Sequence, residues 1–400
     1  MVNPDESDKE EKNMKDVSII GIGTTPFSIL DGKSLKEIAT QACLDAIKDA
    51  GIEKKTIEAF YLGNFISGIL LGQETIAPLV ANCLGLPKEV PCTKVEGACC
   101  SGGIAFRHGY LLVAAGLAKF VLVAGVEKMS SSTTEKNTEG LASAFDQETE
   151  GRTGLTFPGF FALIARRHMH QYGTKIEHLA MVSVKNHGNS VRNPRARFRK
   201  KVTLEEVLAS KMVASPIKLY DCCPISDGAA AAVLCPTEIA HHFHKKPIDI
   251  LASAQTTGFS TSYDMDDPTT LAATVLAAQK AYRMANLSPR DVDVAELHDC
   301  FTMAEIVDSE DLGFFAKGKG GFAVEEGLTN IGGRIPINPS GGLISKGHPV
   351  GATGLGQVFE IVKQLRGEHE NQVENAQIGL THNLGATGQL CTVNILRRRE

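Results

Sequence analysis

The chain has 400 residues, of which 43% are hydrophobic and 22% charged, and these values exclude a disordered or fibrous protein. Its 41 basic and 46 acidic side chains give a formal net charge of −5, so no overall attraction to nucleic acid or to anionic membranes is expected. The sequence also lacks an apolar stretch of the length needed to cross a bilayer. We therefore expect two or three domains or one large repeated architecture, without nucleic acid or a membrane as partner.

The ten cysteines fit neither of the two structural uses of clustered thiols. The chain is too long for the disulfide framework of a small secreted protein, and it contains no CxxC pair for zinc or an iron–sulfur cluster. Residues 1–15 hold five acids and three lysines and read as a disordered acidic tail, not a signal peptide. We expect a cytoplasmic protein with free thiols and no bound metal.

The first predicted elements are a strand, a helix and a second strand. Residues 17–22 predict a buried strand, and residues 57–62 predict the strand that follows the helix. The Ser34 hydroxyl can cap the helix, and Gly51 can end it. The apolar residues of this helix share one face: Leu35, Ile38, Ala39, Ala42, Ala46 and Ile47.

The helix, turn and strand pattern of residues 42–62 returns at residues 277–297 with a constant offset. The matched pairs are Ala42 with Ala277, Ala46 with Ala281, Ala50 with Ala285, Ile52 with Leu287, Ile57 with Val292, and Leu62 with Leu297. The alternative is a similarity of composition between two alanine-rich amphipathic helices. Duplication predicts an α/β protein with two similar halves, parallel strands, and helices between the layers.

A large insertion is predicted between the strands of the first half. Residues 129–214 have few strand signals and many polar residues, so we expect mainly loops there. Residues 227–234 (DGAAAAVL) then return to the pattern of a buried strand.

Four segments combine nucleophilic or basic side chains with glycine. In the first, Cys99 precedes an apolar helical run, and the free N–H groups of a helix start lower the pKa of a thiol. A buried structural cysteine is the alternative there. In the second, His298 and Cys300 follow a predicted strand, and on an extended chain both would face one cavity. A histidine bonded to backbone is the alternative.

The third and fourth segments are rich in glycine. Residues 338–354 hold His348 before a proline in a loop that can present an imidazole rigidly. A phosphate-binding loop is the alternative, but the Lys-Ser/Thr ending of such loops is missing. Residues 381–388 follow a predicted strand at 377–380, and their glycine N–H groups can form half of an oxyanion hole.

Taken together, these motifs resemble the thiolase superfamily over residues 16–398, and most closely its archaeal acetoacetyl-CoA and sterol-carrier-protein-type members. The motifs are ACCSGG (98–103), HDCF (298–301), SKGHPVGATG (345–354) and HNLGATG (382–388), with supporting agreement at 123–130, 185–194 and 224–234. The resemblance implies an α/β fold of five layers (α-β-α-β-α), duplicated, with a loop-domain insertion. It implies a tail at 1–15, an N-terminal half at 16–128 and 215–245, a loop domain covering the substrate at 129–214, and a C-terminal half at 246–400.

The resemblance also implies roles for individual residues. Cys99 is the nucleophile that accepts the acyl group, and His348 takes its proton. His298 and His348 hold the enolate oxygen, while the N–H groups of Cys99 and Gly385 form the second oxyanion hole. The chain departs from the usual C-x-G motif at Asn383, which is expected to contact substrate instead, so Cys300 is assigned the acid/base role of the condensing step.

Two further substrate contacts are expected for coenzyme A. The basic stretch 192–201 holds six cations and no acid, and its Arg192, Arg195 and Arg197 are candidates for a phosphate clamp. A solvated loop or a salt-bridged subunit contact is the alternative. Cys223 falls near a serine of the family that touches the pantetheine arm.

The function implied is that of an acetyl-CoA C-acetyltransferase, which joins two acetyl-CoA molecules reversibly through acetyl-Cys99, without any cofactor, in lipid metabolism and the mevalonate pathway. One alternative is a 3-ketoacyl-CoA thiolase for longer or branched chains. An alternative of another class is a non-catalytic scaffold or lipid-carrier subunit. The implied partners are acetyl-CoA and coenzyme A, a second copy or three further copies of the chain, and a complex with hydroxymethylglutaryl-CoA synthase and a small OB-fold zinc-ribbon protein.

Overall fold

The computed structural model describes residues 14–399, and nine strands of this part of the chain form one mixed sheet. The strands are β1 (Val17–Thr24), β2 (Ala59–Gly63), β3 (Cys92–Val95), β4 (Val121–Glu127), β7 (Gly228–Pro236), β8 (Ile248–Thr257), β9 (Val294–Glu296), β10 (Ile378–Gly385) and β11 (Leu390–Arg398). Their order across the sheet is β3-β2-β4-β7-β1-β8-β11-β10-β9. A separate hairpin pairs β5 (Met212–Ala214) with β6 (Ile217–Lys218).

The two halves of the sheet repeat one topology, which confirms the predicted duplication. The second and fourth strands of each half, β2 with β4 and β9 with β10, pair in parallel, and the next pair, β4 with β7 or β10 with β11, is antiparallel. A single parallel bridge between Ala295 and Ile337 stands where β3 pairs with β2 in the first half. The expectation of all-parallel strands is wrong, because turns such as 386–389 return the chain directly beside itself.

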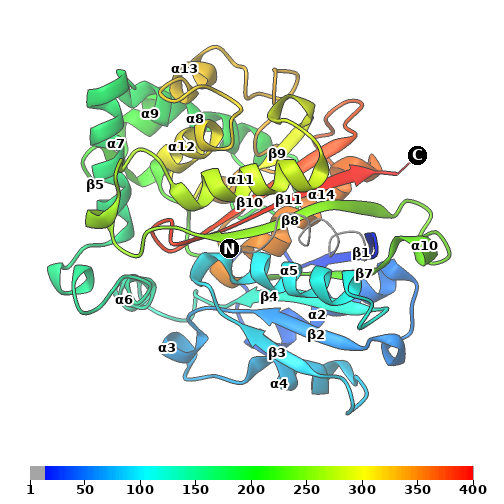
Figure 1. The fold of residues 1–400 in the computed structure, drawn as a ribbon. Coiled ribbons are helices and arrows are strands. Elements are labelled where there is room, and N and C mark those ends of the chain that lie inside the picture. Colours follow the sequence, from blue (N-terminus) through cyan, green and yellow to red (C-terminus); the bar gives the residue numbers. More distant parts are fainter. Residues whose placement is uncertain (1–13, 400) are drawn as a thin grey trace, which may run out of the picture.

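Helices cover both faces of each half-sheet and fill the space between them (Figure 1). The outer helices of the first half are α2 (Leu35–Ala50) and α4 (Ile76–Leu84), and those of the second half are α11 (Ala272–Ala285) and α12 (Thr302–Asp311). The central helices α5 (Ser101–Ala114) and α14 (Thr353–Arg366) contact strands of both halves. The fold therefore has the expected five layers, with the half-sheets joined by the antiparallel pairing of β1 with β8.

Helix α2 shows how local sequence fixes the ends of an element. The Ser34 hydroxyl accepts a hydrogen bond from the Glu37 N–H, and the Glu37 carboxylate accepts one from the Ser34 N–H in return. Gly51 ends the helix in the left-handed conformation at φ 66°. The predicted helix and both of its capping residues are thus confirmed.

The insertion between β4 and β7 is more helical than its polar composition suggested. It contains α6 (Thr134–Ala142), α7 (Phe157–Tyr172), α8 (Ile176–Ser190) and α9 (Leu204–Ala209), so the expectation of mainly loops is wrong. Buried residues of α7 and α8, among them Phe161 and Leu179, join the same apolar core as α11 and α12. This packing gives the two helices the tertiary support that their sequences alone do not reveal.

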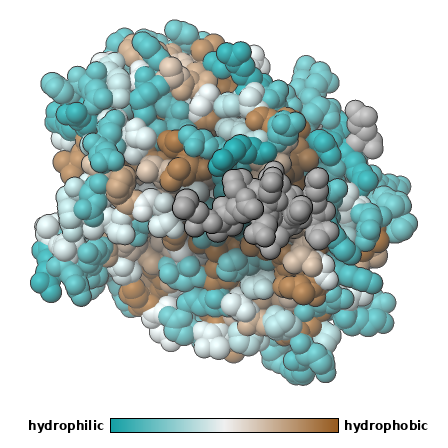
Figure 2. All heavy atoms as spheres, viewed as in Figure 1, coloured by the Kyte–Doolittle hydropathy of each residue, from teal (hydrophilic) through white to brown (hydrophobic). Residues whose placement is uncertain are grey.

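Short helices complete the fold: α3 (Ser67–Leu71), α10 (Thr237–Ala240) and α13 (Gly320–Glu325). Hydrophobic and hydrophilic residues are interspersed over the face in Figure 2. Within residues 14–399, none of the helices has the length and apolar character to cross a membrane. Most of the predicted acidic tail, residues 1–13, lies outside the described residues.

Candidate active site

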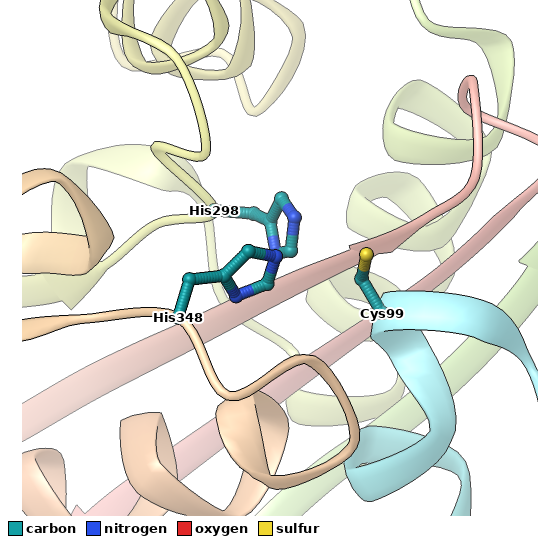
Figure 3. Close-up of side chains that lie close together, drawn as sticks. All are labelled: Cys99, His298 and His348. Carbon is teal, nitrogen blue, oxygen red and sulfur yellow. The ribbon is translucent and has the colours of Figure 1, made fainter. Parts of the chain in front are cut away.

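The structure brings together three of the predicted catalytic residues from distant parts of the chain. The Cys99 sulfur and one ring nitrogen each of His298 and His348 all lie within 4.8 Å of one another. Figure 3 shows the two imidazoles side by side, with the thiol beside them. All three residues are buried, with exposed fractions of 7%, 2% and 6%. A thiol next to an imidazole is the arrangement that nucleophilic catalysis by cysteine requires.

Cys99 lies in a one-turn helix, Ala98–Cys100, that leads directly into α5. The sequence predicts that this helix start lowers the pKa of the thiol, and this prediction is wrong in direction. Burial raises the pKa of Cys99 to about 12, and the nearby Cys100 and Glu127 raise it further. The resting nucleophile is therefore a thiol, and it needs a base to become reactive.

His348 can be that base. Its loop approaches α14, where the Thr353 hydroxyl lies 2.7 Å from His348 Nδ1 and donates its own proton to the Pro349 carbonyl at 3.2 Å. The hydroxyl oxygen therefore accepts the Nδ1 proton, which leaves a lone pair on Nε2. Burial lowers the pKa of His348 to about 3, so the ring is neutral at physiological pH and can accept a proton.

His298 is buried behind the end of β9. Burial, and then the neighbouring His348 and His382, hold the pKa of His298 well below its usual value. Its Nδ1 lies 3.1 Å from the Asn383 side-chain nitrogen, which also donates to the Cys99 carbonyl at 3.0 Å. Both amide protons of Asn383 are used inside the protein, and this leaves none for a substrate.

Cys300 and Cys223 lie together beside the nucleophile. The Cys223 N–H donates to the Cys300 carbonyl at 3.1 Å. Burial raises the pKa of Cys300 well above its usual value, and the nearby Cys223 and Cys99 raise it further. The segment is not the extended chain expected from sequence, because consecutive hydrogen bonds from Asp299 N–H to Leu297 O and from Cys300 N–H to His298 O fold it tightly.

Two carboxylates that the sequence analysis missed hold the His348 loop in place. Asp299 accepts hydrogen bonds from the N–H groups of Leu343 at 2.6 Å and Ile344 at 3.3 Å. Glu127, at the end of β4, accepts one from the Gly351 N–H at 3.1 Å. A charged residue that ends the wholly buried strand 121–127 was the available signal for Glu127.

Glycines allow the two central helices to meet at the site. A Cβ on Gly354, at the start of α14, would lie 2.3 Å from the Gly103 backbone nitrogen in α5. A Cβ on Gly102 would likewise lie 2.8 Å from the Gly351 carbonyl oxygen. Only glycine permits this approach, and it fixes the nucleophile of one half against the base of the other.

The fourth predicted motif lies within a strand and not after one. Residues 381–385 belong to β10, where Gly385 pairs with Leu390 of β11, so the predicted strand 377–380 ends too early. A Cβ on Gly385 would lie 2.6 Å from the Gly97 carbonyl oxygen, which places this glycine beside the nucleophile turn. The neighbouring Cys100 thiol donates to the Asn383 carbonyl at 3.1 Å and is fully buried.

The three candidate arginines occupy different environments. Arg192 is exposed. Arg195 forms ion pairs with Glu370 at 2.9 Å and Glu360 at 3.5 Å, and its side chain is 15% exposed. Arg197 is half-buried and lies over the Phe198 ring at 5.4 Å. Arg195 is thus committed to carboxylates, whereas Arg192 is accessible to a phosphate.

Among residues 14–399, Cys99, His298 and His348 are also the group whose atoms could together ligate a metal ion. Thiolate and imidazole suit a soft cation such as Zn²⁺. Acyl transfer by a thiol and an imidazole needs no such ion.

Comparisons with known proteins agree along the whole fold. The model described as thiolase, N-terminal domain, matches residues 17–238, and that described as thiolase C-terminal domain-like matches residues 254–398. An acetyl-CoA acetyltransferase of Methanothermobacter thermautotrophicus is 50% identical over 386 residues, covering 96% of this chain and 100% of its own. Sterol carrier protein 2 of Oryctolagus cuniculus is 37% identical, covering 93% of this chain and 70% of its own. The solved structure titled "Ltp2-ChsH2(DUF35) aldolase" has a TM-score of 0.83 at 29% identity, covering 96% of this chain and 98% of its own.

Proposed function

Because this chain belongs to the thiolase family, we propose that it is an acetyl-CoA C-acetyltransferase, which condenses two acetyl-CoA molecules reversibly to acetoacetyl-CoA and coenzyme A. The observation that carries this proposal is the convergence of the Cys99 thiol with the His298 and His348 imidazoles. The 50% identity to an archaeal acetyl-CoA acetyltransferase supports the choice of substrate.

In the first half-reaction, His348 Nε2 takes the proton of the Cys99 thiol as the sulfur attacks the acetyl-CoA carbonyl carbon. The oxyanion that forms is held by the N–H groups of Cys99 and Gly385. When this intermediate collapses, the bond to the coenzyme A sulfur breaks, and the imidazolium returns its proton to that leaving group. The products are acetyl-Cys99 and free coenzyme A, as in other ping-pong reactions.

In the second half-reaction, a base removes an α-proton from the next acetyl-CoA, and the resulting carbanion attacks the acetyl group on Cys99. We assign the base to Cys300 and the binding of the enolate oxygen to His298 and His348. The raised pKa of Cys300 keeps it protonated at neutral pH, which suits the reverse direction, where the thiol donates a proton to the departing carbanion.

Longer or branched 3-ketoacyl-CoA substrates are the alternative within the same chemistry. A non-catalytic scaffold or lipid carrier is disfavoured, because a scaffold has no need for a buried thiol beside two neutral imidazoles. A direct assay separates these functions. Purified protein is incubated with acetyl-CoA, and acetoacetyl-CoA and free coenzyme A are measured, with Cys99→Ala as control. Cleavage of 3-ketoacyl-CoA esters of increasing length then ranks the substrates.

We also propose that the protein acts in the cytoplasm as a homodimer or homotetramer, in lipid metabolism leading to mevalonate. Residues 129–214 would cover the substrate, with Arg192 near the coenzyme A phosphates and Cys223 near the pantetheine arm. A solved relative whose title pairs it with a DUF35 protein supports the expected accessory OB-fold zinc-ribbon protein, with hydroxymethylglutaryl-CoA synthase as third member. Light scattering of the purified protein, alone and mixed with these partners, tests the assembly.

A further inference from the structure

We propose that Asn383 is a positioning residue that holds the His298 imidazole in the tautomer protonated on Nε2, so that His298 presents a hydrogen-bond donor to the substrate oxygen. The role as a donor to the enolate oxygen rests on the proposed function, whereas the tautomer itself does not.

The hydrogen bonds around Asn383 fix which end of its amide faces the site. The Cys99 carbonyl oxygen can only accept a hydrogen bond, and it lies 3.0 Å from the Asn383 Nδ2. A flipped amide would set its own oxygen against that carbonyl. The NH₂ group must therefore face Cys99, and its second proton is directed at His298 Nδ1, 3.1 Å away.

The location of the His298 proton follows from this orientation. Because Nδ1 accepts a hydrogen bond from Asn383, it carries a lone pair and no proton. The ring is 2% exposed and surrounded by His348 and His382, both buried imidazoles, so a second positive charge is unfavourable there. A neutral imidazole without a proton on Nδ1 carries it on Nε2.

The neighbouring histidine has the opposite tautomer. His348 gives its Nδ1 proton to Thr353 and keeps a lone pair on Nε2. The two adjacent rings are thus divided into a donor, His298, and a base, His348. Without Asn383, His298 could move its proton to Nδ1 and turn a lone pair toward a substrate oxygen, which would repel the negative charge of an enolate.

The other end of the Asn383 amide indicates that this residue is kept for its donors. Its Oδ1 is buried and has no hydrogen-bond partner among residues 14–399. Leaving a buried acceptor unpaired costs stability, and an apolar side chain of similar shape would avoid that cost. A purely structural role therefore does not explain an asparagine here.

Nuclear magnetic resonance of protein labelled with ¹⁵N-histidine locates the proton directly. Long-range ¹H–¹⁵N correlation distinguishes the two neutral tautomers, and loss of a signal in His298→Asn assigns the ring. We expect His298 protonated on Nε2 in the unsubstituted protein and a shift toward Nδ1 protonation in Asn383→Ala. Asn394→Ala is the matched control, because it removes a buried amide from β11 that bonds only to Thr381 within the described residues.

Kinetics supply the second readout. Asn383→Ala and Asn383→Leu should acetylate Cys99 at a rate within about threefold of the unsubstituted protein, and lower the condensation rate roughly ten- to a hundredfold, the effect of a weakened oxyanion contact. Asn394→Ala should preserve both rates. Full condensation by a folded Asn383→Ala variant would overturn the proposal, and so would Nδ1 protonation of His298 in the unsubstituted protein, a result that needs no variant to fold. Failure of the unsubstituted protein to acetylate would refute the proposed function and leave the tautomer measurement standing.

Discussion

The imidazole rings of His298 and His348 lie nearly perpendicular, at 84°, with their centroids 5.0 Å apart. The two rings come from different loops, one after β9 and one before α14, and each is anchored by its own hydrogen-bond partner at Nδ1. Because burial keeps both rings neutral, they can lie this close without charge repulsion. This neutrality lets one ring donate a hydrogen bond while the other accepts a proton.

Substitution of His348 by alanine should change the pH dependence of acylation as well as its rate. Neutral His348 is available at every pH above its lowered pKa, so the unsubstituted rate should be flat between pH 6 and 8, a range chosen on the basis of that pKa of about 3. In His348→Ala only preformed thiolate reacts. Since the pKa of Cys99 is raised to about 12, that fraction grows about tenfold per pH unit. Stopped-flow release of coenzyme A measures both profiles, and we expect a loss of roughly 10²–10⁴-fold at pH 7. Parallel, flat profiles for the two proteins would contradict the assignment of His348 as base.

Removal of the Cys300 thiol should separate the two half-reactions. Cys300→Ala is expected to form acetyl-Cys99 normally but to lose condensation by roughly 10²-fold or more, because no group then exchanges the α-proton. Exchange of acetyl-CoA methyl protons with deuterated water measures the missing step. Cys43→Ala, which removes a buried thiol from α2, is the matched control and should retain both activities. Full condensation in Cys300→Ala would remove Cys300 from the mechanism.

The sequence was sufficient to predict the duplicated fold and the catalytic trio, because both rest on local patterns. The caps of α2 at Ser34 and Gly51 and the motifs around Cys99 and His348 are contiguous signals. What could not be read depends on burial and on partners distant in sequence. The pKa of Cys99 follows desolvation by the whole fold, which outweighs the local effect of a helix start. The partners of Asn383 lie 284 and 85 positions away.

The tight contact between α5 and α14 should make Gly354 intolerant of a methyl group. A Cβ there would meet the Gly103 nitrogen at 2.3 Å and the Asn383 Oδ1 at 2.4 Å, so the helices must separate. We expect Gly354→Ala to lower the free energy of unfolding by about 1–3 kcal/mol, as overpacking does, and to reduce acylation by moving His348 away from Cys99. Denaturant unfolding and the acylation rate measure the two effects. Gly188→Ala, on α8 with open space around its Cβ position, should show neither. Unchanged acylation in Gly354→Ala would show that this contact does not position the site.

Arg195 and Arg192 should differ in what their loss affects. Arg195→Met breaks ion pairs with Glu360 and Glu370 and leaves the buried Glu360 with fewer cations, so the free energy of unfolding should fall by roughly 1–3 kcal/mol. Arg192→Ala should leave stability unchanged and raise the KM for acetyl-CoA several-fold, because it removes an accessible cation from the proposed phosphate clamp. Thermal unfolding and steady-state kinetics on both variants test this separation. A raised KM in Arg195→Met alone would place the clamp at the wrong arginine.

The most direct test of the account is the mass of the Cys99 peptide after incubation with acetyl-CoA. We predict one acetyl group on Cys99, protection of this thiol from iodoacetamide after acetylation, and its loss when a second acetyl-CoA or coenzyme A is supplied. The adduct should be absent from Cys99→Ala and greatly slowed in His348→Ala. Folded protein that binds acetyl-CoA and yet leaves Cys99 unmodified would contradict the central claim that this thiol carries the acyl group.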